Sequence, residues 1–365
     1  MAGRVTMRDI AEKAGVSLAT VSNVLGGKAR HASPQTIARV YAIAEQLGYV
    51  PVQTRIPETK RSPTIGVIVY SLTSPFFNAA LNGVYAVCSR LGFNIIVHSN
   101  FGREHREIVS ARALVEQRVD GLIFISSSAY RYDDAFKCAV EARIPVAVVN
   151  RAIDPDAAFH VLIDNEQAAY DATQHLIALG HRAIGHIHLA TKGPGATQAA
   201  AERAAGFQRA LAEYGLEYRE AWVKPELISN VAVSHDVIAY PNVVSMLSSA
   251  ERPTAILCGT DYLAVGALRA AAALGMRVPH DLAIVGHDDT VVAQYATPTL
   301  TSVRVPMEQA GVRAAEALIH SIWKGEKLSG SEILQCELIV RDSSVVRFSE
   351  EMITPTPLGN RSDTK

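Results

Sequence analysis

Several strand-like apolar runs in this 365-residue chain are followed directly by polar or aromatic side chains that could bind a small molecule. They are Ser71, Phe76 and Phe77 after the first run, Asn150 and Arg151 after 146–149, Thr260 and Asp261 after 255–258, and Asp288 after 282–285. Arg203, which is expected to open a helix, adds a guanidinium. Charged groups make the stronger hydrogen bonds and an aromatic ring offers a flat apolar wall, so this set is suited to fixing hydroxyl groups.

Some of these residues also have a purely structural explanation. Asp261 could equally cap its own helix, and Phe76 and Phe77 cannot both face a ligand, so one of them belongs to the core. His186 and His188 alternate along one apolar run and therefore share a face. We interpret these two as packed strand histidines rather than metal ligands.

Motifs for catalysis and cofactor binding are weak throughout the chain. Residues 192–195 (Lys-Gly-Pro-Gly) lack the Gly-Lys-Ser/Thr ending of a phosphate loop and predict an ordinary loop. An enzyme of the doubly wound class is a weak alternative, because no Ser/His/Asp order, paired carboxylates or nucleophile elbow stands out. Cys88, Cys138, Cys258 and Cys336 are far apart and lack zinc-finger spacing, so we expect buried thiols, no metal and no cofactor.

A second candidate surface lies near the N-terminus, where residues 5–25 predict two short helices joined by a tight turn. Thr6 and Asp9 have capping-box spacing, Gly15 permits the turn, and Ser17 is expected to cap the second helix. Apolar residues of both helices face a core, and the side chains left outward on the second helix are Leu18, Ala19, Thr20, Ser22 and Asn23. This pattern predicts a helix-turn-helix whose second helix enters a DNA groove.

A third helix is expected to complete this N-terminal module. Ser33 is its predicted cap and Pro34 suits the first helical position. Apolar residues then repeat at helical spacing, at Ile37, Val40, Tyr41, Ala44 and Leu47. Three short helices of this kind form a compact DNA-binding module.

Charge is spread unevenly along the chain, whose net charge is −1. Residues 1–63 carry nine Lys or Arg and four Asp or Glu, a net charge of +5, which leaves −6 on the remainder. A basic head on an acidic body fits phosphate binding by one end. We expect a cytoplasmic protein with no membrane partner, because no signal peptide and no bilayer-spanning apolar run is present. The missing export signal also disfavours the main alternative, a solute-binding protein without a DNA role.

After Pro63 the pattern alternates between short apolar strands and helices. The expected strands are 65–70, 94–98, 121–125, 146–149, 184–189, 255–258 and 282–285. The expected helices are 77–91, 104–117, 166–179, 203–214, 262–274 and 307–323. Alternating β and α elements predict parallel sheets covered on both faces, here two doubly wound subdomains with a cleft between them. The carboxyl ends of the strands at that cleft are the default ligand site.

The chain resembles the lactose/galactose-repressor (LacI/GalR) family over about residues 4–345. The N-terminal signature is matched by Thr6, Asp9, Ala11, Ala14, Gly15, Val16, Ser17, Thr20, Val21, Ser22 and Leu25, and 48–51 (Gly-Tyr-Val-Pro) matches the usual end of the third helix. The body resembles the family's effector domain, which is similar to periplasmic sugar-binding proteins. Matching strings include 74–77 (Ser-Pro-Phe-Phe), 203–207 (Arg-Ala-Ala-Gly-Phe) and 286–289 (Gly-His-Asp-Asp).

This resemblance implies a homodimeric repressor of carbohydrate-utilisation genes that binds double-stranded operator DNA and responds to a small sugar-like effector. It implies base reading by Leu18, Ala19 and Asn23 and phosphate contacts by Thr20, Ser22 and His31, with Thr6 and Ser17 completing the DNA surface. It implies effector contacts by Asn150, Arg203, Thr260, Asp288 and the Phe76 region. We add Ser71, Phe77 and Asp261 to this second set from their positions after strands.

Two positions depart from the family pattern. His287 stands where the family usually has an aromatic residue. The connector 52–63 lacks the usual hinge-helix leucine, and Pro57 would break a helix at its middle, which leaves Ile56 as the only candidate minor-groove wedge. We therefore expect a connector that stays largely non-helical on DNA.

The expected organisation is an all-α helix-turn-helix head followed by an α/β, periplasmic-binding-protein-like body of two parallel-sheet subdomains. The head spans 1–51, the linker 52–63, the effector-binding and dimerisation domain 64–348, and a disordered tail 349–365. By the resemblance, the chain passes between the subdomains near Asp164, Val291 and Gly325.

Overall fold

The structure is a computed structural model that describes residues 6–25, 32–47, 62–101, 103–126, 134–154, 156–191, 196–226 and 235–345. The chain divides into two compact units, residues 1–61 and 62–365. His31, nearly all of the connector 52–63, the loop 192–195 and the tail 349–365 lie outside the described residues. The expectations for these segments therefore stay predictions.

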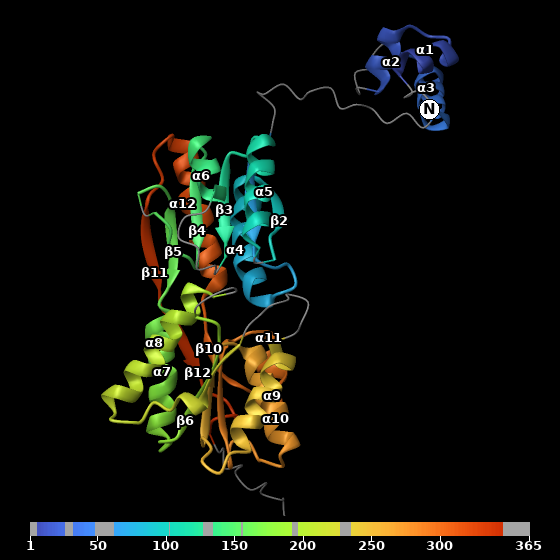
Figure 1. Cartoon of the computed structure of the whole chain (residues 1–365). Coiled ribbons are helices and arrows are strands. Elements are labelled where there is room, and N and C mark those ends of the chain that lie inside the picture. Colours follow the sequence, from blue (N-terminus) through green and yellow to red (C-terminus); the bar gives the residue numbers. More distant parts are fainter. Residues whose placement is uncertain are drawn as a thin grey trace, which may run out of the picture. The chain divides into compact units, whose positions relative to one another are not determined.

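The described part of the first unit forms three short helices, α1 (Met7–Ala14), α2 (Leu18–Leu25) and α3 (Pro34–Gln46) (Figure 1). Ile10, Val21 and Val40, one from each helix, are fully buried in a shared core. The predicted capping box is confirmed, because the Asp9 carboxylate accepts hydrogen bonds from the Thr6 backbone N–H at 2.7 Å and the Thr6 hydroxyl at 2.8 Å. These contacts also lower the pKa of Asp9.

The turn between α1 and α2 is formed by the residues predicted for it. Gly15 ends α1 in the left-handed conformation, with φ at 60°, which costs glycine little. The Ser17 hydroxyl oxygen accepts a hydrogen bond from the Thr20 backbone N–H at 3.1 Å and so caps α2. Local sequence chemistry thus fixes where α2 begins and which of its faces is buried.

The helical spacing groups Tyr41 with the core residues of α3, but the structure places its side chain at the edge of this core. Its side chain is 49% exposed. Its hydroxyl donates a hydrogen bond to the carbonyl oxygen of Val24, in the last turn of α2, at 3.1 Å. The phenol therefore satisfies one of the free carbonyls that a helix end leaves, which explains why an amphipathic tyrosine lies at the edge of this core.

The first subdomain of the body is built on a six-stranded sheet in the order β11-β5-β4-β3-β1-β2, in which neighbouring strands are all parallel. Its strands are β1 (Thr64–Val69), β2 (Asn94–Ser99), β3 (Gly121–Ile125), β4 (Val146–Val149), β5 (Phe159–Ile163) and β11 (Gly330–Leu334). Helices α4 (Pro75–Leu91) and α12 (Met307–Lys324) cover one face, and α5 (Glu104–Glu116) and α6 (Asp134–Glu141) cover the other (Figure 1). The central strands are buried on both faces, which explains their continuous apolar runs.

The second subdomain repeats this plan with the sheet order β12-β10-β9-β8-β6-β7. Its strands are β6 (Ile184–Leu189), β7 (Val223–Glu226), β8 (Ala255–Cys258), β9 (Ala283–Asp288), β10 (Thr301–Arg304) and the antiparallel β12 (Glu337–Ile339). Helices α7 (Asn165–Ala178) and α8 (Gln198–Glu213) cover one face, and α9 (His235–Leu247) and α10 (Asp261–Ala273) cover the other. The short helix α11 (Val291–Tyr295) packs beside α10.

The chain passes between the two sheets three times, and two of these passages differ from the expected positions. The first lies at Asp164, between β5 and α7. The second lies at residues 305–306 rather than near Val291, because α11 still packs on the second subdomain and β10 follows it. The third lies at residues 335–336 rather than near Gly325, because β11 first pairs with β5 of the first sheet. These three connecting segments, which are far apart in sequence, therefore meet at the junction between the two subdomains.

Candidate functional site

The exposed face of α2 carries the side chains predicted to meet DNA. Leu18, Ala19, Ser22 and Asn23 are exposed, with Leu18 at 44% despite its apolar character. Thr20 is only half-buried, and its hydroxyl lies 2.8 Å from the Ser17 hydroxyl, so its orientation is set by the cap. The structure thus brings this surface together on one short helix. A small apolar and amide-bearing surface of this kind suits thymine methyl groups and base edges in a major groove.

Two of the predicted DNA-contacting residues already have structural roles. The hydroxyls of Thr6 and Ser17 take part in the caps of α1 and α2. Both residues remain exposed at the helix N-termini, where backbone N–H groups favour a phosphate. A phosphate contact by either residue stays a prediction.

The first sheet presents Ser71, Phe76 and Asn150 just beyond the carboxyl ends of its strands. Ser71 is buried and accepts a hydrogen bond from the Thr73 backbone N–H at 3.2 Å. Phe76 is half-buried and meets the edge of Phe77, whereas Phe77 is buried in the core and stacks on Tyr70 with ring centroids 5.0 Å apart. One of the two rings belongs to the core, as expected. That ring is Phe77, so its assignment to the effector contacts was wrong, and Phe76 remains the candidate wall of the cleft.

Asn150 is the most distinctive polar group on this side. It follows β4 with φ at 60°, a conformation that asparagine tolerates better than most residues. Its side chain is buried, and its Nδ2 has no hydrogen-bond partner. It lines a pocket of about 240 Å³ together with Arg151, Asp164, Gln198 and Glu202, which come from both subdomains. A buried amide donor without a partner in such a pocket is suited to a ligand hydroxyl.

Arg203 comes from α8 on the second subdomain, where it lies in the second turn rather than at the helix start. The helix begins at Gln198, after the cap Thr197, because the Ala-rich segment before Arg203 is also helical. The guanidinium donates to the carbonyl oxygen of Gly259 at 2.5 Å and to that of Ala199 at 3.2 Å. Backbone carbonyls thus hold the arginine at the edge of the second sheet.

Asp288, the last residue of β9, faces Arg203 across a gap. Its Oδ1 lies 3.9 Å from the Arg203 Nη1, too far for a hydrogen bond. Burial raises the pKa of Asp288 well above its usual value, and the nearby guanidinium only partly offsets this. Burial also lowers the pKa of Arg203. The two charged groups are therefore close together, largely desolvated and incompletely paired, which suits them to a polar ligand.

Thr260 and Asp261 begin α10 and have internal partners. The Thr260 hydroxyl oxygen accepts from the Leu263 backbone N–H at 3.2 Å, so Thr260 is the helix cap. Asp261 is fully buried, and its carboxylate accepts hydrogen bonds from Thr290 and Ser302. The structure therefore places Asp261 behind the cleft and not at the surface that a ligand would touch.

Three buried histidines lie beneath the Arg203–Asp288 pair. His186 and His188 are both buried on β6, with rings 4.8 Å apart, and His186 packs on Phe207 of α8. His287, next to Asp288, is also buried. Burial lowers the pKa of all three, so they are neutral near pH 7. The packing predicted for His186 and His188 is thus confirmed, and His287 is buried beside them. Among the described residues, no group of three side chains that could hold a metal ion occurs.

The sequence did not single out Gln198, Glu202 or the buried partner of Arg151. Gln198 was missed because α8 was expected to begin five residues later, yet its Oε1 accepts from the Ala152 backbone N–H across the junction at 3.2 Å. Glu107, which pairs with Arg151 at 2.9 Å, is one of several acidic residues along a mixed helix. No local signal in the sequence separates it from its exposed neighbours.

Comparison with known proteins gives the family. Residues 6–52 match the family model for bacterial regulatory proteins of the lacI family, and residues 173–344 match the periplasmic binding protein-like domain. The HTH-type transcriptional repressor PurR of Vibrio campbellii is 31% identical over 345 residues, which cover 93% of this chain and 98% of that protein. The chain belongs to the lacI family of bacterial regulatory proteins.

Other relatives of this lacI-family regulator agree with its fold. The ribose operon repressor of Haemophilus influenzae is 30% identical and covers 93% of this chain and 98% of its own length. A transcriptional regulator CelR–cellobiose complex has a TM-score of 0.67 and 30% identity, covering 93% of this chain and all of that one. The lac repressor dimer bound to operator and the anti-inducer ONPF has a TM-score of 0.66 and 26% identity, covering 94% of this chain and all of that one.

These findings make the chain a ligand-responsive, DNA-binding transcriptional regulator with an N-terminal helix-turn-helix and a periplasmic-binding-protein-like domain. Among its described helices, none has the length and apolar character needed to cross a membrane.

Proposed function

We propose that this regulator represses carbohydrate-utilisation genes in the cytoplasm and that a sugar or sugar derivative in the cleft of its body changes its affinity for operator DNA. The observation that carries this proposal is the buried, incompletely paired Arg203–Asp288 couple at the carboxyl edge of the second sheet. A carboxylate and a guanidinium at this spacing can each bind a ring hydroxyl through a charge-assisted hydrogen bond.

The first sheet supplies groups that complement such a ligand. Phe76 offers an apolar ring, and the unpaired Asn150 Nδ2 offers a donor. Two related structures contain sugars: the CelR–cellobiose complex and a LacI family transcriptional regulator from Enterococcus faecium with bound ribose. Their ligands support a saccharide as the chemical class for this cleft, with Ser71 and Thr260 placed to shape it.

We also propose a homodimer that binds a near-palindromic operator through α2 of each subunit. The lac repressor structure, a dimer bound to operator, supports this assembly. On the body, Val291 and Tyr295 of α11 are 50% and 81% exposed, unusual for large apolar side chains, and suit contact with a second copy. Two basic heads would then meet two half-sites.

A thermal-shift screen against monosaccharides, disaccharides and sugar phosphates tests the effector class. We expect one saccharide to raise the melting temperature of the wild type but not of Arg203→Met, which keeps the side-chain length and removes the guanidinium. Asp281→Asn, at a half-buried side chain paired with Arg277 on the same subdomain, is the matched control and should respond like the wild type. If no saccharide shifts the wild type, or if Arg203→Met shifts equally, the proposed class or site is wrong.

Replacement of Asn23 by alanine tests the proposed DNA surface. An asparagine that pairs with adenine through two hydrogen bonds contributes about 1–3 kcal/mol of discrimination, so Asn23→Ala should relax the preference at one operator position. Ser22→Ala is the control and should weaken all sequences about equally, since a phosphate contact carries no base preference. Selection from a randomised DNA pool measures both effects. An unchanged base preference in Asn23→Ala would exclude this residue from base reading.

A further inference from the structure

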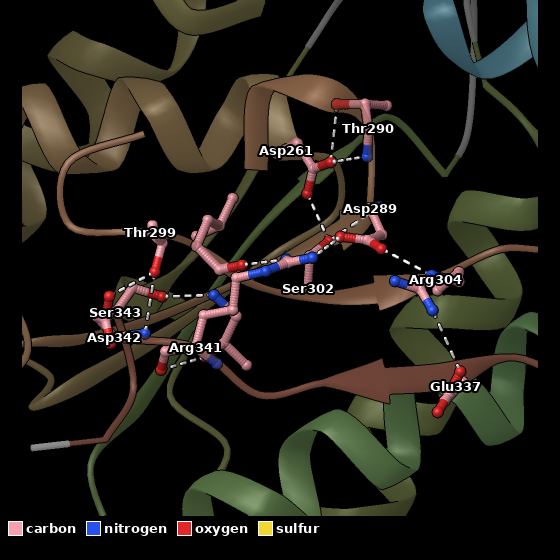
Figure 2. A network of polar contacts seen from close by, with 12 residues as sticks. Asp261, Asp289, Thr290, Thr299, Ser302, Arg304, Glu337, Arg341, Asp342 and Ser343 are labelled. Atoms are coloured by element: carbon pink, nitrogen blue, oxygen red, sulfur yellow. Dashed lines mark hydrogen bonds and ion pairs between the residues drawn. The ribbon is translucent and has the colours of Figure 1, made fainter. Parts of the chain in front are cut away.

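The buried Asp261 carboxylate belongs to a network of hydrogen bonds and ion pairs around the end of β9 (Figure 2). Its Oδ2 accepts from the Thr290 backbone N–H at 2.6 Å and from the Thr290 hydroxyl at 2.9 Å. Its Oδ1 accepts from the Ser302 hydroxyl at 2.5 Å. The side chain is fully buried, so this carboxylate reaches three donors inside the protein and no solvent.

These donors lie on either side of the turn that carries Asp288. Thr290 is two residues beyond Asp288 and caps α11, while Ser302 lies on the neighbouring strand β10. The Ser302 hydroxyl oxygen also accepts from the Asp289 backbone N–H at 3.1 Å. Asp261 and Ser302 together therefore fix the backbone at Asp289 and at Thr290, directly after Asp288.

The turn needs this support because its backbone is strained. Asp288 has φ at 105° and Asp289 has φ at 47°, in the region that residues with a side chain rarely adopt. The Asp289 carboxylate is held in turn by Arg304 at 2.8 Å and by Arg341 at 2.7 Å, and Figure 2 shows Asp289 between these two arginines. Such conformations persist only where surrounding contacts over-determine them.

Asp261 also fits tightly against β9 itself. A Cβ added to Gly286 would lie 2.6 Å from the Asp261 Oδ1, so glycine is needed for the carboxylate to approach this strand. The carboxylate thus packs against the backbone two residues before Asp288 and bonds to the backbone two residues after it. It therefore contacts the backbone on both sides of Asp288, the residue that faces Arg203.

We infer that Asp261 is a positioning residue for the effector cleft: it holds the 288–290 turn so that the Asp288 carboxylate faces Arg203 and the ligand, and it does not touch the ligand itself. The effect on ligand binding rests on the proposed effector site. The claim that Asp261 positions the Asp288 carboxylate does not. A residue that merely capped α10 would need only the backbone N–H groups of its own helix, whereas the donors to this carboxylate, Thr290 and Ser302, lie 29 and 41 residues away in sequence.

Measurement of the Asp288 titration tests the inference without any ligand. Protein labelled with ¹³C at the aspartate carboxyls gives a signal for Asp288, identified by its loss in Asp288→Asn. Asp261→Asn and Asp261→Ala remove the same charge. The side-chain amide of the asparagine still accepts from Thr290 and can donate to Ser302, whereas alanine can do neither. We expect the pKa of Asp288 in Asp261→Ala to differ by at least one pH unit from that in Asp261→Asn. Equal values in the two variants would overturn the inference.

Thr290 offers a second pair of variants if Asp261→Ala does not fold. Thr290→Ser keeps the hydroxyl that donates to Asp261, and Thr290→Val keeps the shape without it. The Asp288 titration should follow the wild type in the first variant and shift in the second. No difference between them would contradict the proposed role of the network.

The saccharide found in the thermal-shift screen supplies the functional readout. Calorimetry should show affinity reduced at least tenfold in Asp261→Ala and within threefold of the wild type in Asp261→Asn, with operator affinity in the absence of saccharide the same in both. Equal loss of affinity in the two variants would overturn the positioning role. If no saccharide binds the wild type, the proposed effector class fails while the carboxyl titration still decides the role of Asp261.

Discussion

Among the described residues, each subdomain contains a buried arginine–carboxylate pair near the junction, and these two pairs are built differently. In the first, Arg151 and Glu107 are 2.9 Å apart, with side chains 1% and 4% exposed. In the second, Arg203 and Asp288 are 3.9 Å apart, with both side chains 8% exposed. The first pair is closed by a direct hydrogen bond, and the second leaves a gap between its charges.

The partners around each pair explain this difference. The second oxygen of Glu107 accepts from the Asn100 side-chain amide, so its carboxylate is satisfied from both sides. Arg203 instead donates to the Gly259 and Ala199 carbonyls, which leaves Asp288 without that hydrogen bond. The Glu107 carboxylate therefore has a donor at each oxygen, whereas the Asp288 carboxylate lacks a hydrogen bond from its arginine and retains capacity for a ligand. The comparison therefore points to a structural role for Glu107 and favours the ligand-binding role proposed for Asp288.

Removal of Glu107 should give the largest effect. Glu107→Ala leaves Arg151 as an uncompensated buried charge, which we expect to lower the free energy of unfolding by about 3–5 kcal/mol. Glu316→Ala, at the exposed ion pair with Arg90, is the control and should change it by less than about 1 kcal/mol. Urea denaturation measures both. A loss from Glu107→Ala as small as that of the control would break the comparison.

A pH series on Asp261 should give the next largest effect. Burial raises the pKa of Asp261 to about 6 from its usual 3.8. Because the folded-state pKa lies above the unfolded one, the stabilisation is full below pH 3.8 and is lost as pH rises through 6. Asp261→Asn removes this titration, so its free energy of unfolding relative to the wild type should increase by about 3 kcal/mol between pH 3.5 and pH 8. A pH-independent difference in urea denaturation would show that the folded-state pKa is ordinary.

Neutralisation of Asp288 should affect ligand binding more than stability. A hydrogen bond to a charged group contributes about 1.5–3 kcal/mol, so Asp288→Asn should weaken saccharide affinity by about 10- to 150-fold. Its effect on unfolding should be smaller than that of Glu107→Ala, because Arg203 keeps its two backbone carbonyls. Calorimetry and urea denaturation of the two variants side by side sharpen the comparison, and the reverse ranking would contradict it.

The sequence predicted the head and the central strands well because their signals are local. The Thr6–Asp9 box, Gly15 and Ser17 act over three or four residues, and the buried strands β3, β4, β6 and β8 read as continuous apolar runs. Five strands were missed. Strands β7, β11 and β12 lie at the ends of their sheets and carry exposed polar side chains, whereas β5 and β10 lie inside their sheets but are short and contain polar residues such as His160, Thr301 and Ser302. An amphipathic tyrosine such as Tyr41 fits the helical repeat whether or not it is buried.

The places of the candidate-site residues in the fold could be predicted from the sequence, but their contacts could not. The positions of Asn150 and Asp288 follow from the rule that ligands bind beyond the carboxyl ends of parallel strands. Asp261 satisfies the same rule, yet its partners Thr290 and Ser302 are 29 and 41 residues away, so only the folded chain shows that it faces inward. The start of α8 was placed too late because an alanine-rich segment has no apolar–polar period to mark it.

The response of operator binding to the saccharide tests the central claim most directly. Fluorescence anisotropy with a labelled operator, selected in vitro with the wild type, gives the affinity with and without the saccharide found by thermal shift. We expect the saccharide to change the operator affinity of the wild type. We expect Asp288→Asn to bind the operator equally well and, at a saccharide concentration that just saturates the wild type, to show a much smaller response. A full response in Asp288→Asn, or none in the wild type with saccharide bound, would contradict control of DNA binding through this pair.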